Sequence, residues 1–181
     1  MEYKKEDSSV LFFEFLRFCL KEDAKVPANL AVMDWDALYK FGKKQAILGV
    51  LFHGIKKLSE SPYRPNKEQI FKWYGAYSYI EQANKQTYKD ADALTTLLRE
   101  KYGVRSCVLK GQTNALMYPD PYMRTSGDID LWTDAKTLDI IRISRELDSK
   151  GEIGYHHIEL SYFKTPVEVH FFPSFMGNLW H

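Results

Sequence analysis

The sequence predicts an α+β protein, in which a helical N-terminal part packs on a small mixed β-sheet. Apolar residues recur at helical spacing up to about residue 102, whereas short segments with the alternation of β-strands follow Gly103. A chain of 181 residues is long enough for one domain or two small ones. We therefore expect a helical region over residues 1–102 and an α/β core over residues 103–181.

The net charge of the chain is close to zero, with 25 basic residues against 24 acidic ones. Proteins that wrap long nucleic acid usually carry clustered Lys and Arg, so this composition argues against long RNA or DNA as a partner. No segment is long and apolar enough to span a bilayer, and Glu14 and Arg17 interrupt the apolar segment 10–20, unlike in a signal peptide. These features predict a cytoplasmic protein.

Both cysteines, Cys19 and Cys107, lie in apolar runs and are expected to be buried.

Three helices are predicted before residue 103. Apolar residues at helical spacing predict the first over 10–20 and the second over 34–58, where glycines weaken the pattern and permit breaks. A long helix is expected over 66–102, after a turn-rich connector. Asn66 is a favourable N-cap, and Gln69 three residues later completes a capping box, in which each side chain bonds the backbone N–H of the other.

Short strands and helices alternate after Gly103. The predicted elements are a strand over 104–110, a short helix over 111–118, a loop over 119–127, a strand over 128–132, a helix over 134–149, and two strands over 153–163 and 167–172 that form a hairpin at Pro166. The sequence ends soon afterwards with the apolar segment 171–180, which suggests a fragment of a longer protein. This segment is also a candidate surface for a protein partner.

The segment "DIDLW" places two aspartates one residue apart in a predicted strand, where Asp is unfavourable. Side chains alternate between the faces of a strand, so Asp128 and Asp130 share one face, and Glu168 shares a face with His170. If the two strands are neighbours with these faces aligned, three carboxylates converge. Two like charges ~4 Å apart repel by about 4 kcal/mol at an effective dielectric constant of about 20, so the cluster favours a bound cation. Carboxylate oxygens are the ligands that Mg²⁺ prefers, and a two-ion site serves phosphate chemistry.

An Asp-hydrophobe-Asp triplet is common by chance at the solvated end of a strand, and its surroundings decide its meaning. The segments "VLKGQTNALMYPDPYMRTSGDIDLW" and "VEVHFF" resemble the uncharacterised bacterial nucleotidyltransferase family, within the superfamily that has the polymerase-beta-like fold. A Leu-Lys-Gly turn, a Tyr-Pro segment, an Arg and an Asp-Ile-Asp-Leu strand come in the order of that family. The resemblance covers about residues 104–172.

The resemblance implies a nucleotidyltransferase fold and a metal-dependent enzyme. The enzyme would move an NMP group, with AMP the expected one, from an NTP co-substrate to an acceptor hydroxyl. Asp128 and Asp130 would bind two Mg²⁺ ions. Glu168 would be the third carboxylate, which either bridges to the second ion or takes the proton from the attacking hydroxyl.

The resemblance also implies a nucleotide-binding turn. The residues that it assigns to the nucleotide are Lys110, Gly111, Gln112, Thr113 and Arg124. The glycine would let the backbone approach the triphosphate beside the next two amides, and the two basic side chains would neutralise phosphate charge. The turn departs from the wider superfamily, because Lys-Gly-Gln stands where a Gly-Ser pair is usual.

Two alternatives to this enzyme remain open. A catalytically silent nucleotidyltransferase fold, regulatory or antitoxin-like, would bind a protein through its helices and apolar tail. The missing serine favours this alternative, and the retained acids disfavour it. A metal-dependent phosphoesterase would use the same acids to aim a water, but the His/Asp ligand clusters common in such sites are missing from the sequence. The acceptor stays open between a small molecule, a protein hydroxyl and an RNA end, with the charge against long RNA.

Three histidines near the end of the chain raise the question of a zinc site. His156 and His157 are adjacent in a predicted strand, so their side chains are expected on opposite faces, where they would not share one ion. Ordinary strand histidines are the preferred interpretation. His170 is expected beside Glu168 on the site face, where it would orient that carboxylate or contact a substrate.

Overall fold

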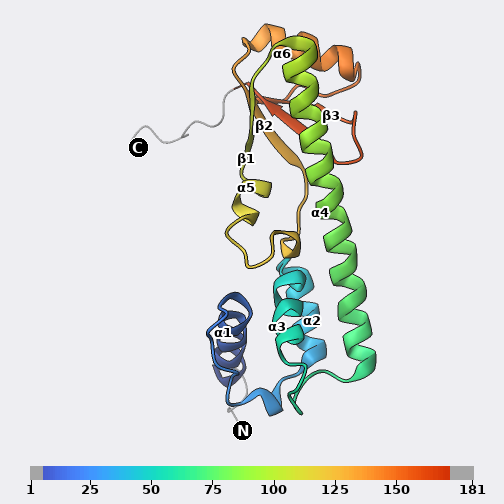
Figure 1. Cartoon of the computed structure of the whole chain (residues 1–181). Helices are drawn as coiled ribbons and strands as arrows, with labels where there is room; N and C mark the ends of the chain where they lie inside the picture. The colour runs from blue at the N-terminus through green and yellow to red at the C-terminus, as the bar shows by residue number, and fades with distance from the viewer. Residues whose placement is uncertain (1–5, 172–181) are drawn as a thin grey trace. The chain divides into compact units, whose positions relative to one another are not determined.

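Residues 6–171 are described by the computed structural model of this chain, and they form an α+β fold, as the sequence predicts (Figure 1). Over this range the chain has six α-helices, two short 3₁₀ helices and a four-stranded mixed sheet. It divides into two compact units, Met1–Asn84 with Leu116–Thr125, and Lys85–Ala115 with Ser126–His181. The domain boundary between residues 102 and 103 stays a prediction.

The first unit is helical. Its elements are α1 (Glu6–Leu20), η1 (Leu30–Val32), α2 (Trp35–Lys44), α3 (Leu48–Lys57), the start of α4 (Lys67–Tyr102) and η2 (Pro121–Met123). Phe15, Leu51, Trp73 and Met123 belong to its apolar core and are at most 1% exposed. The short turn η2 therefore supplies a core residue from a segment far along the sequence. A Cβ at Gly49 would overlap the carbonyl oxygen of Met123, so α3 and η2 approach closely only because position 49 is glycine.

The segment predicted as a helix over 34–58 is broken once, between α2 and α3. Asp34 caps α2, because its Oδ1 accepts hydrogen bonds from the backbone N–H groups of Asp36 and Ala37 at 3.1 and 2.9 Å. The break falls at Ala46, whose φ of 57° lies in the left-handed region and cannot continue a right-handed helix. The hydrophobic periodicity continues through both helices, so it does not locate this break.

The long helix α4 begins and ends as predicted. The Gln69 N–H donates to Asn66 Oδ1 at 2.9 Å and the Asn66 N–H donates to Gln69 Oε1 at 3.1 Å, which confirms the capping box. At the other end Gly103 has a φ of 66°, and the Val104 N–H donates to the Leu98 carbonyl at 3.0 Å. This is the left-handed glycine ending that residue 103 predicts. The helix runs unbroken for 36 residues and belongs to both units.

The second unit contains the sheet, in the strand order β1-β2-β4-β3. Its elements besides α4 are β1 (Ser106–Leu109), α5 (Gly111–Ala115), β2 (Ile129–Thr133), α6 (Thr137–Leu147), β3 (His157–Leu160) and β4 (Val167–His170). β2 and β4 are parallel, whereas β1 pairs antiparallel with β2 and β3 pairs antiparallel with β4. The predicted hairpin of the last two strands is therefore confirmed, and the central strand pair joins segments almost 40 residues apart.

One face of this sheet is apolar and covered by helices. Ile129 and Leu131 of β2 are fully buried and cluster with Val167 and Val169 of β4. Helices α4 and α6 supply further members of the same cluster, among them Leu94, Leu98, Ile140 and Ile143. The alternate residues of the strands, which include the candidate site, therefore lie on the opposite face.

The two cysteines differ from each other. Cys19 is buried in the first unit, as predicted, but Cys107 is exposed, so the prediction that both are buried was wrong for Cys107. Cys107 lies on β1 opposite Trp132, two residues from Leu109, which pairs with Asp130. The alternation of the strand thus places it on the face away from the apolar cluster, which its apolar neighbours in sequence do not reveal.

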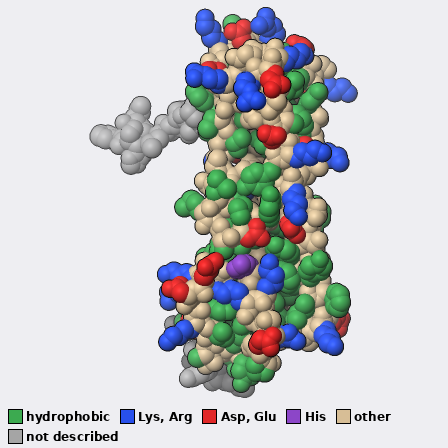
Figure 2. Space-filling view, in the orientation of Figure 1, with side chains coloured by type: hydrophobic (Ala, Val, Ile, Leu, Met, Phe, Trp, Pro, Cys, Tyr) green, Lys and Arg blue, Asp and Glu red, His purple; other side chains and the backbone are tan. Residues whose placement is uncertain are grey.

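Within the described residues, none of the helices combines the length and the hydrophobicity needed to cross a bilayer. On the face of the molecule drawn in Figure 2, basic and acidic side chains are interspersed, as the near-zero net charge leads one to expect. The predicted partner surface at 171–180 lies, after Phe171, outside the described residues.

Candidate functional site

Carboxylates from three neighbouring strands share one row on the face opposite the helices. Asp130 of β2 pairs with Glu168 of the parallel strand β4, and Glu168 pairs in turn with Glu159 of β3. The strands of Asp130 and Glu168 are therefore neighbours in aligned register, which is the condition on which the predicted acidic cluster depended. Asp130 is only 7% exposed, Glu168 is half-buried and Glu159 is exposed. Glu159 was not singled out from the sequence, although the hairpin register brings it beside Glu168.

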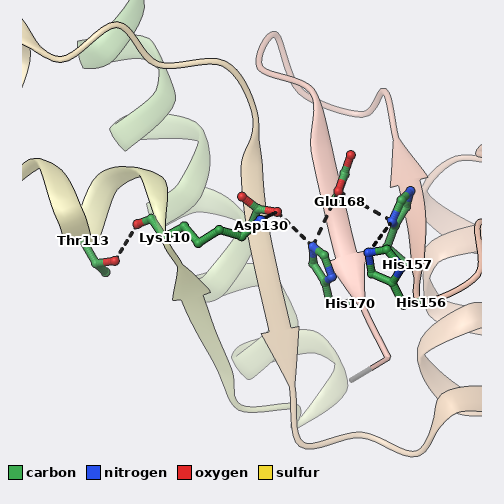
Figure 3. Close-up of polar contacts among 7 residues, drawn as sticks. All are labelled: Lys110, Thr113, Asp130, His156, His157, Glu168 and His170. Carbon is green, nitrogen blue, oxygen red and sulfur yellow. Dashed lines mark hydrogen bonds and ion pairs between the residues drawn. The ribbon is translucent and has the colours of Figure 1, made fainter. Parts of the chain in front are cut away.

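Asp130 is held between a lysine and a histidine. Its Oδ1 accepts a hydrogen bond from Lys110 Nζ at 2.9 Å and lies 2.9 Å from Nε2 of His170 (Figure 3). The His170 side chain is 3% exposed, whereas the Lys110 side chain is 63% exposed. Because both donors meet the same oxygen, the second carboxylate oxygen of Asp130 keeps its capacity to bind a cation.

The acidic residues of the site raise the pKa of Lys110. The hydrogen bond to Asp130 holds the pKa of Lys110 above its usual value, and the negative charges of Asp130, Asp128 and Glu168 act in the same direction. The lysine therefore stays protonated, and its ammonium partly neutralises the acidic cluster. A positive charge at this place fits a site that handles phosphate.

Asp128 has a different environment from Asp130. It precedes the first residue of β2 and is exposed. Oxygen and nitrogen donors of Asp130, Glu168 and His170 all lie within 4.8 Å of one another, and this group does not include Asp128. The structure thus brings two of the three predicted carboxylates together around His170, and leaves Asp128 at the solvated edge near Lys110.

The predicted nucleotide-binding turn is the short connection between β1 and α5. Lys110 and Gly111 have φ angles of 44° and 34°, both in the left-handed region. The Thr113 N–H donates to the Lys110 carbonyl at 2.9 Å, so this amide is already used within the turn. Gln112 is buried, and neither polar atom of its side chain has a hydrogen-bond partner in the described part of the chain. The backbone carbonyl of Gln112 accepts a hydrogen bond from the Tyr88 hydroxyl at 3.1 Å, which connects the turn to α4.

Arg124 belongs to the first unit. There its carbonyl oxygen accepts a hydrogen bond from Nδ2 of Asn84 at 2.6 Å, and the same amide donates to the Tyr122 carbonyl at 2.8 Å. Asn84 is 1% exposed, so these bonds fix the backbone of the segment 122–124 from inside the unit. The role of Arg124 at a phosphate stays a prediction.

The histidines correct the expectation drawn from strand alternation. β3 begins at His157, so His156 lies before the strand and the alternation rule does not separate the two rings. His157 Nδ1 lies 3.4 Å from His156 Nε2, and ring nitrogens of His156, His157 and His170 all lie within 4.8 Å of one another. The prediction that His156 and His157 face apart was therefore wrong. His170 does lie on the site face beside Glu168, with Nε2 3.6 Å from Glu168 Oε2.

A family model described as "Uncharacterised nucleotidyltransferase" matches residues 31–173, which is most of the chain. The match includes the sheet, the turn between β1 and α5 and every residue of the site described above. A comparison with curated proteins and with solved structures finds no match.

Proposed function

The chain belongs to the uncharacterised nucleotidyltransferase family, and from this premise we propose that it transfers an NMP group, with AMP the first candidate, from an NTP to an acceptor hydroxyl in a Mg²⁺-dependent reaction. The observation that carries the proposal is the pairing of Asp130 with Glu168 across two parallel strands, beside a protonated lysine and a buried histidine. Membership of the family supports nucleotidyl transfer in general. The metal, the base and the acceptor belong to the proposal.

The donor set of the site fits a hard divalent cation. Asp130 and Glu168 offer carboxylate oxygens from adjacent positions, and Asp128 would add a third from the edge of the strand. Asp130, Glu168 and Asp128 are thus the residues that would hold Mg²⁺. When bound, the ions would supply charge neutralisation for the leaving pyrophosphate and polarisation of the attacking oxygen.

The side chains of the chain itself would perform four tasks. Glu168 would accept the proton of the acceptor hydroxyl. At the same time the oxygen of that hydroxyl would form a bond to the α-phosphorus, and the bond from the α-phosphorus to pyrophosphate would break. Lys110 would contribute a fixed positive charge next to the phosphates. His170 would hold Asp130 Oδ1 in place from the buried side. Gly111 would let the backbone of the turn approach the triphosphate, and its φ of 34° is one that strains a residue with a side chain.

A catalytically silent binding module is the second candidate, and one observation favours it. Lys110 Nζ already lies 2.9 Å from Asp130 and partly satisfies the charge that a metal ion would neutralise. In such a protein the acidic site would be structural, and no triphosphate would be turned over.

Calorimetric titration with a non-hydrolysable ATP analogue, with and without Mg²⁺, tests the proposal. We expect Mg²⁺-dependent binding by the wild type and binding at least about tenfold weaker in Asp130→Ala and Glu168→Ala. Asp139→Ala is the matched control, since Asp139 is an exposed carboxylate of α6 whose side chain pairs with Arg142 on the same helix. It should bind as the wild type does.

Undiminished Mg²⁺-dependent binding in both site variants would refute the acidic site. If the wild type binds the ATP analogue as expected, competition by GTP, CTP and UTP would rank the affinity of the site for the four bases. Binding without release of pyrophosphate in the presence of small-molecule and protein acceptors would favour the silent module.

A further inference from the structure

Three imidazole rings cluster on the same sheet face, one row beyond the carboxylates. The register of β3 and β4 pairs His157 with His170, just as it pairs Glu159 with Glu168. His156 joins them from the residue before β3, with its ring centroid 4.8 Å from that of His157 and 5.1 Å from that of His170. One ring nitrogen of each histidine lies within 4.8 Å of one ring nitrogen of each of the other two, so a single metal ion could contact all three rings.

The backbone holds the three rings in this arrangement. The Phe171 N–H donates to the His156 carbonyl at 2.8 Å, and the Gly154 N–H donates to the His157 carbonyl at 2.8 Å. His156 is therefore bonded to the residue that follows β4, although it lies outside β3. A Cβ at Gly154 would lie 3.0 Å from His157 Nε2, so the residue at this position leaves room for the ring.

His170 carries a second and independent sign of a ligand. Its Nε2 lies 2.9 Å from Oδ1 of Asp130, and a carboxylate oxygen accepts from an N–H, so in the tautomer that carries its proton on Nε2 the other nitrogen, Nδ1, has a free lone pair. Nδ1 is buried and has no hydrogen-bond partner within residues 6–171. A buried polar atom without a partner costs free energy and calls for an explanation. Figure 3 shows Asp130 on one side of the His170 ring and His156 and His157 on the other.

A carboxylate on one nitrogen and a metal ion on the other is the usual arrangement of a metal-binding histidine. His157 differs from His170, because carboxylates lie near both of its ring nitrogens, with Nδ1 3.6 Å from Glu168 Oε2 and Nε2 3.9 Å from Glu159 Oε1. Its Nδ1 is also the atom that lies 3.4 Å from His156 Nε2, so this nitrogen faces the histidine cluster. Imidazole nitrogens suit Zn²⁺ and related first-row ions, whereas Mg²⁺ prefers oxygen. The carboxylate row therefore suits Mg²⁺, and the neighbouring histidine cluster suits Zn²⁺ or a related ion.

We propose that His156, His157 and His170 form a binding site for one first-row transition-metal ion, with Zn²⁺ the best match, adjacent to the carboxylate site. Three protein nitrogens leave a fourth tetrahedral position for water or another ligand. Because His170 contacts Asp130 through its other nitrogen, an ion at this site would also fix the position of that carboxylate. The site goes beyond the proposed nucleotidyl transfer and does not depend on it.

The test is a Co²⁺ and Zn²⁺ titration of metal-stripped, tag-free full chain, followed by visible absorption for Co²⁺ and by calorimetry for Zn²⁺. We expect one ion per chain, tetrahedral Co²⁺ absorption, and no displacement by an excess of Mg²⁺. His156→Ala and His157→Ala should each weaken binding at least about tenfold. His53→Gln, which removes a histidine of α3 in the first unit, should leave the affinity unchanged.

Absence of stoichiometric binding by the wild type would overturn the proposal, as would equal affinity in both site variants. If a variant fails to fold, as judged by circular dichroism, Zn K-edge absorption of the wild type decides. Scattering from three imidazoles supports the site, and a shell of oxygen ligands alone overturns it. The nucleotide titration uses Mg²⁺ and carboxylate variants, so the failure of either proposal is distinguishable from the failure of the other.

Discussion

Asp130 is a nearly buried carboxylate, and its two partners differ in how much they contribute to the stability of the fold. His170 meets it from inside the protein and Lys110 from the solvent side. An exposed ion pair contributes about 1 kcal/mol or less, because water screens it. Removal of a buried partner costs more, because the carboxylate then loses a hydrogen bond that water does not replace.

We expect His170→Ala to lower the free energy of unfolding by about 2–3 kcal/mol, from the lost hydrogen bond and the space left behind. Lys110→Ala should lower it by less than about 1 kcal/mol. Urea unfolding followed by circular dichroism measures both. Equal costs for the two variants would contradict this ranking, and a larger cost for Lys110→Ala would make the lysine the main partner of the carboxylate.

The two thiols provide a second prediction at the scale of single residues. Burial raises the pKa of Cys19 to about 12, against a small opposing effect of nearby backbone hydrogen bonds and Lys57, so this thiol stays protonated at neutral pH. Cys107 is exposed on β1. A disulfide reagent such as Ellman's should modify one thiol quickly in the folded protein and the second only on unfolding. Cys107→Ser should abolish the fast phase, and a fast phase that survives would contradict the described burial of Cys19.

At the scale of elements, the break between α2 and α3 depends on one residue in an unfavourable conformation. Ala46 has a φ of 57°, and the left-handed region costs a non-glycine residue about 1–2 kcal/mol. The Ile47 N–H donates to the Gly42 carbonyl at 2.9 Å, so the turn is closed around this residue. The strain is local and should be relieved by glycine.

Ala46→Gly should therefore raise the free energy of unfolding by about 0.5–1 kcal/mol, because glycine adopts this φ without strain. The matched control is Ala93→Gly, at an exposed position inside α4, which should lower it by about 1 kcal/mol. Chemical denaturation of the two variants compares them directly. The same sign for both changes would exclude a left-handed residue at position 46.

For the whole molecule, the second unit depends on contacts between distant segments. Asp90 of α4 accepts hydrogen bonds from the Thr165 N–H and hydroxyl at 2.9 and 2.8 Å, across 75 residues of sequence. Thr165 lies just before β4, so this contact fixes the hairpin to the long helix. Burial raises the pKa of Asp90, but the bonds from Thr165 and from Gln86 outweigh it and hold the pKa below its usual value.

A depressed carboxyl pKa stabilises the fold above the unfolded pKa of about 3.9, and this contribution is lost as the pH falls through the folded pKa. Asp90→Asn should therefore cost about 1.5–3 kcal/mol near pH 7 and progressively less below about pH 4. Asp92→Asn, an exposed change on the same helix, is the control and should show almost no cost. A cost for Asp90→Asn that is the same at all pH values would mean that its charge is not involved.

The capping box of Asn66 and Gln69, the glycine ending at Gly103 and the alternation along residues 129–131 and 167–170 could all be predicted, because each depends on residues a few positions apart. The same is true of the shared face of Glu168 and His170. The strand β2 begins at Ile129, so the alternation rule does not extend to Asp128. The position of His156 could not be predicted, because it depends on the residue at which β3 begins. The exposure of Cys107 follows from the orientation of a four-residue strand, which its apolar neighbours do not determine.

The sequence by itself therefore determined the α+β class, the two ends of the long helix α4 and the family, since these follow from local backbone preferences and from the order of motifs. Only the tertiary structure decided that β2 lies beside β4, that Lys110 and His170 meet the same oxygen of Asp130, and that three histidines gather one row away. The physical reason is that strand order and register are set by burial of the apolar cluster under α4 and α6. The polar side chains of the site lie where that burial leaves them.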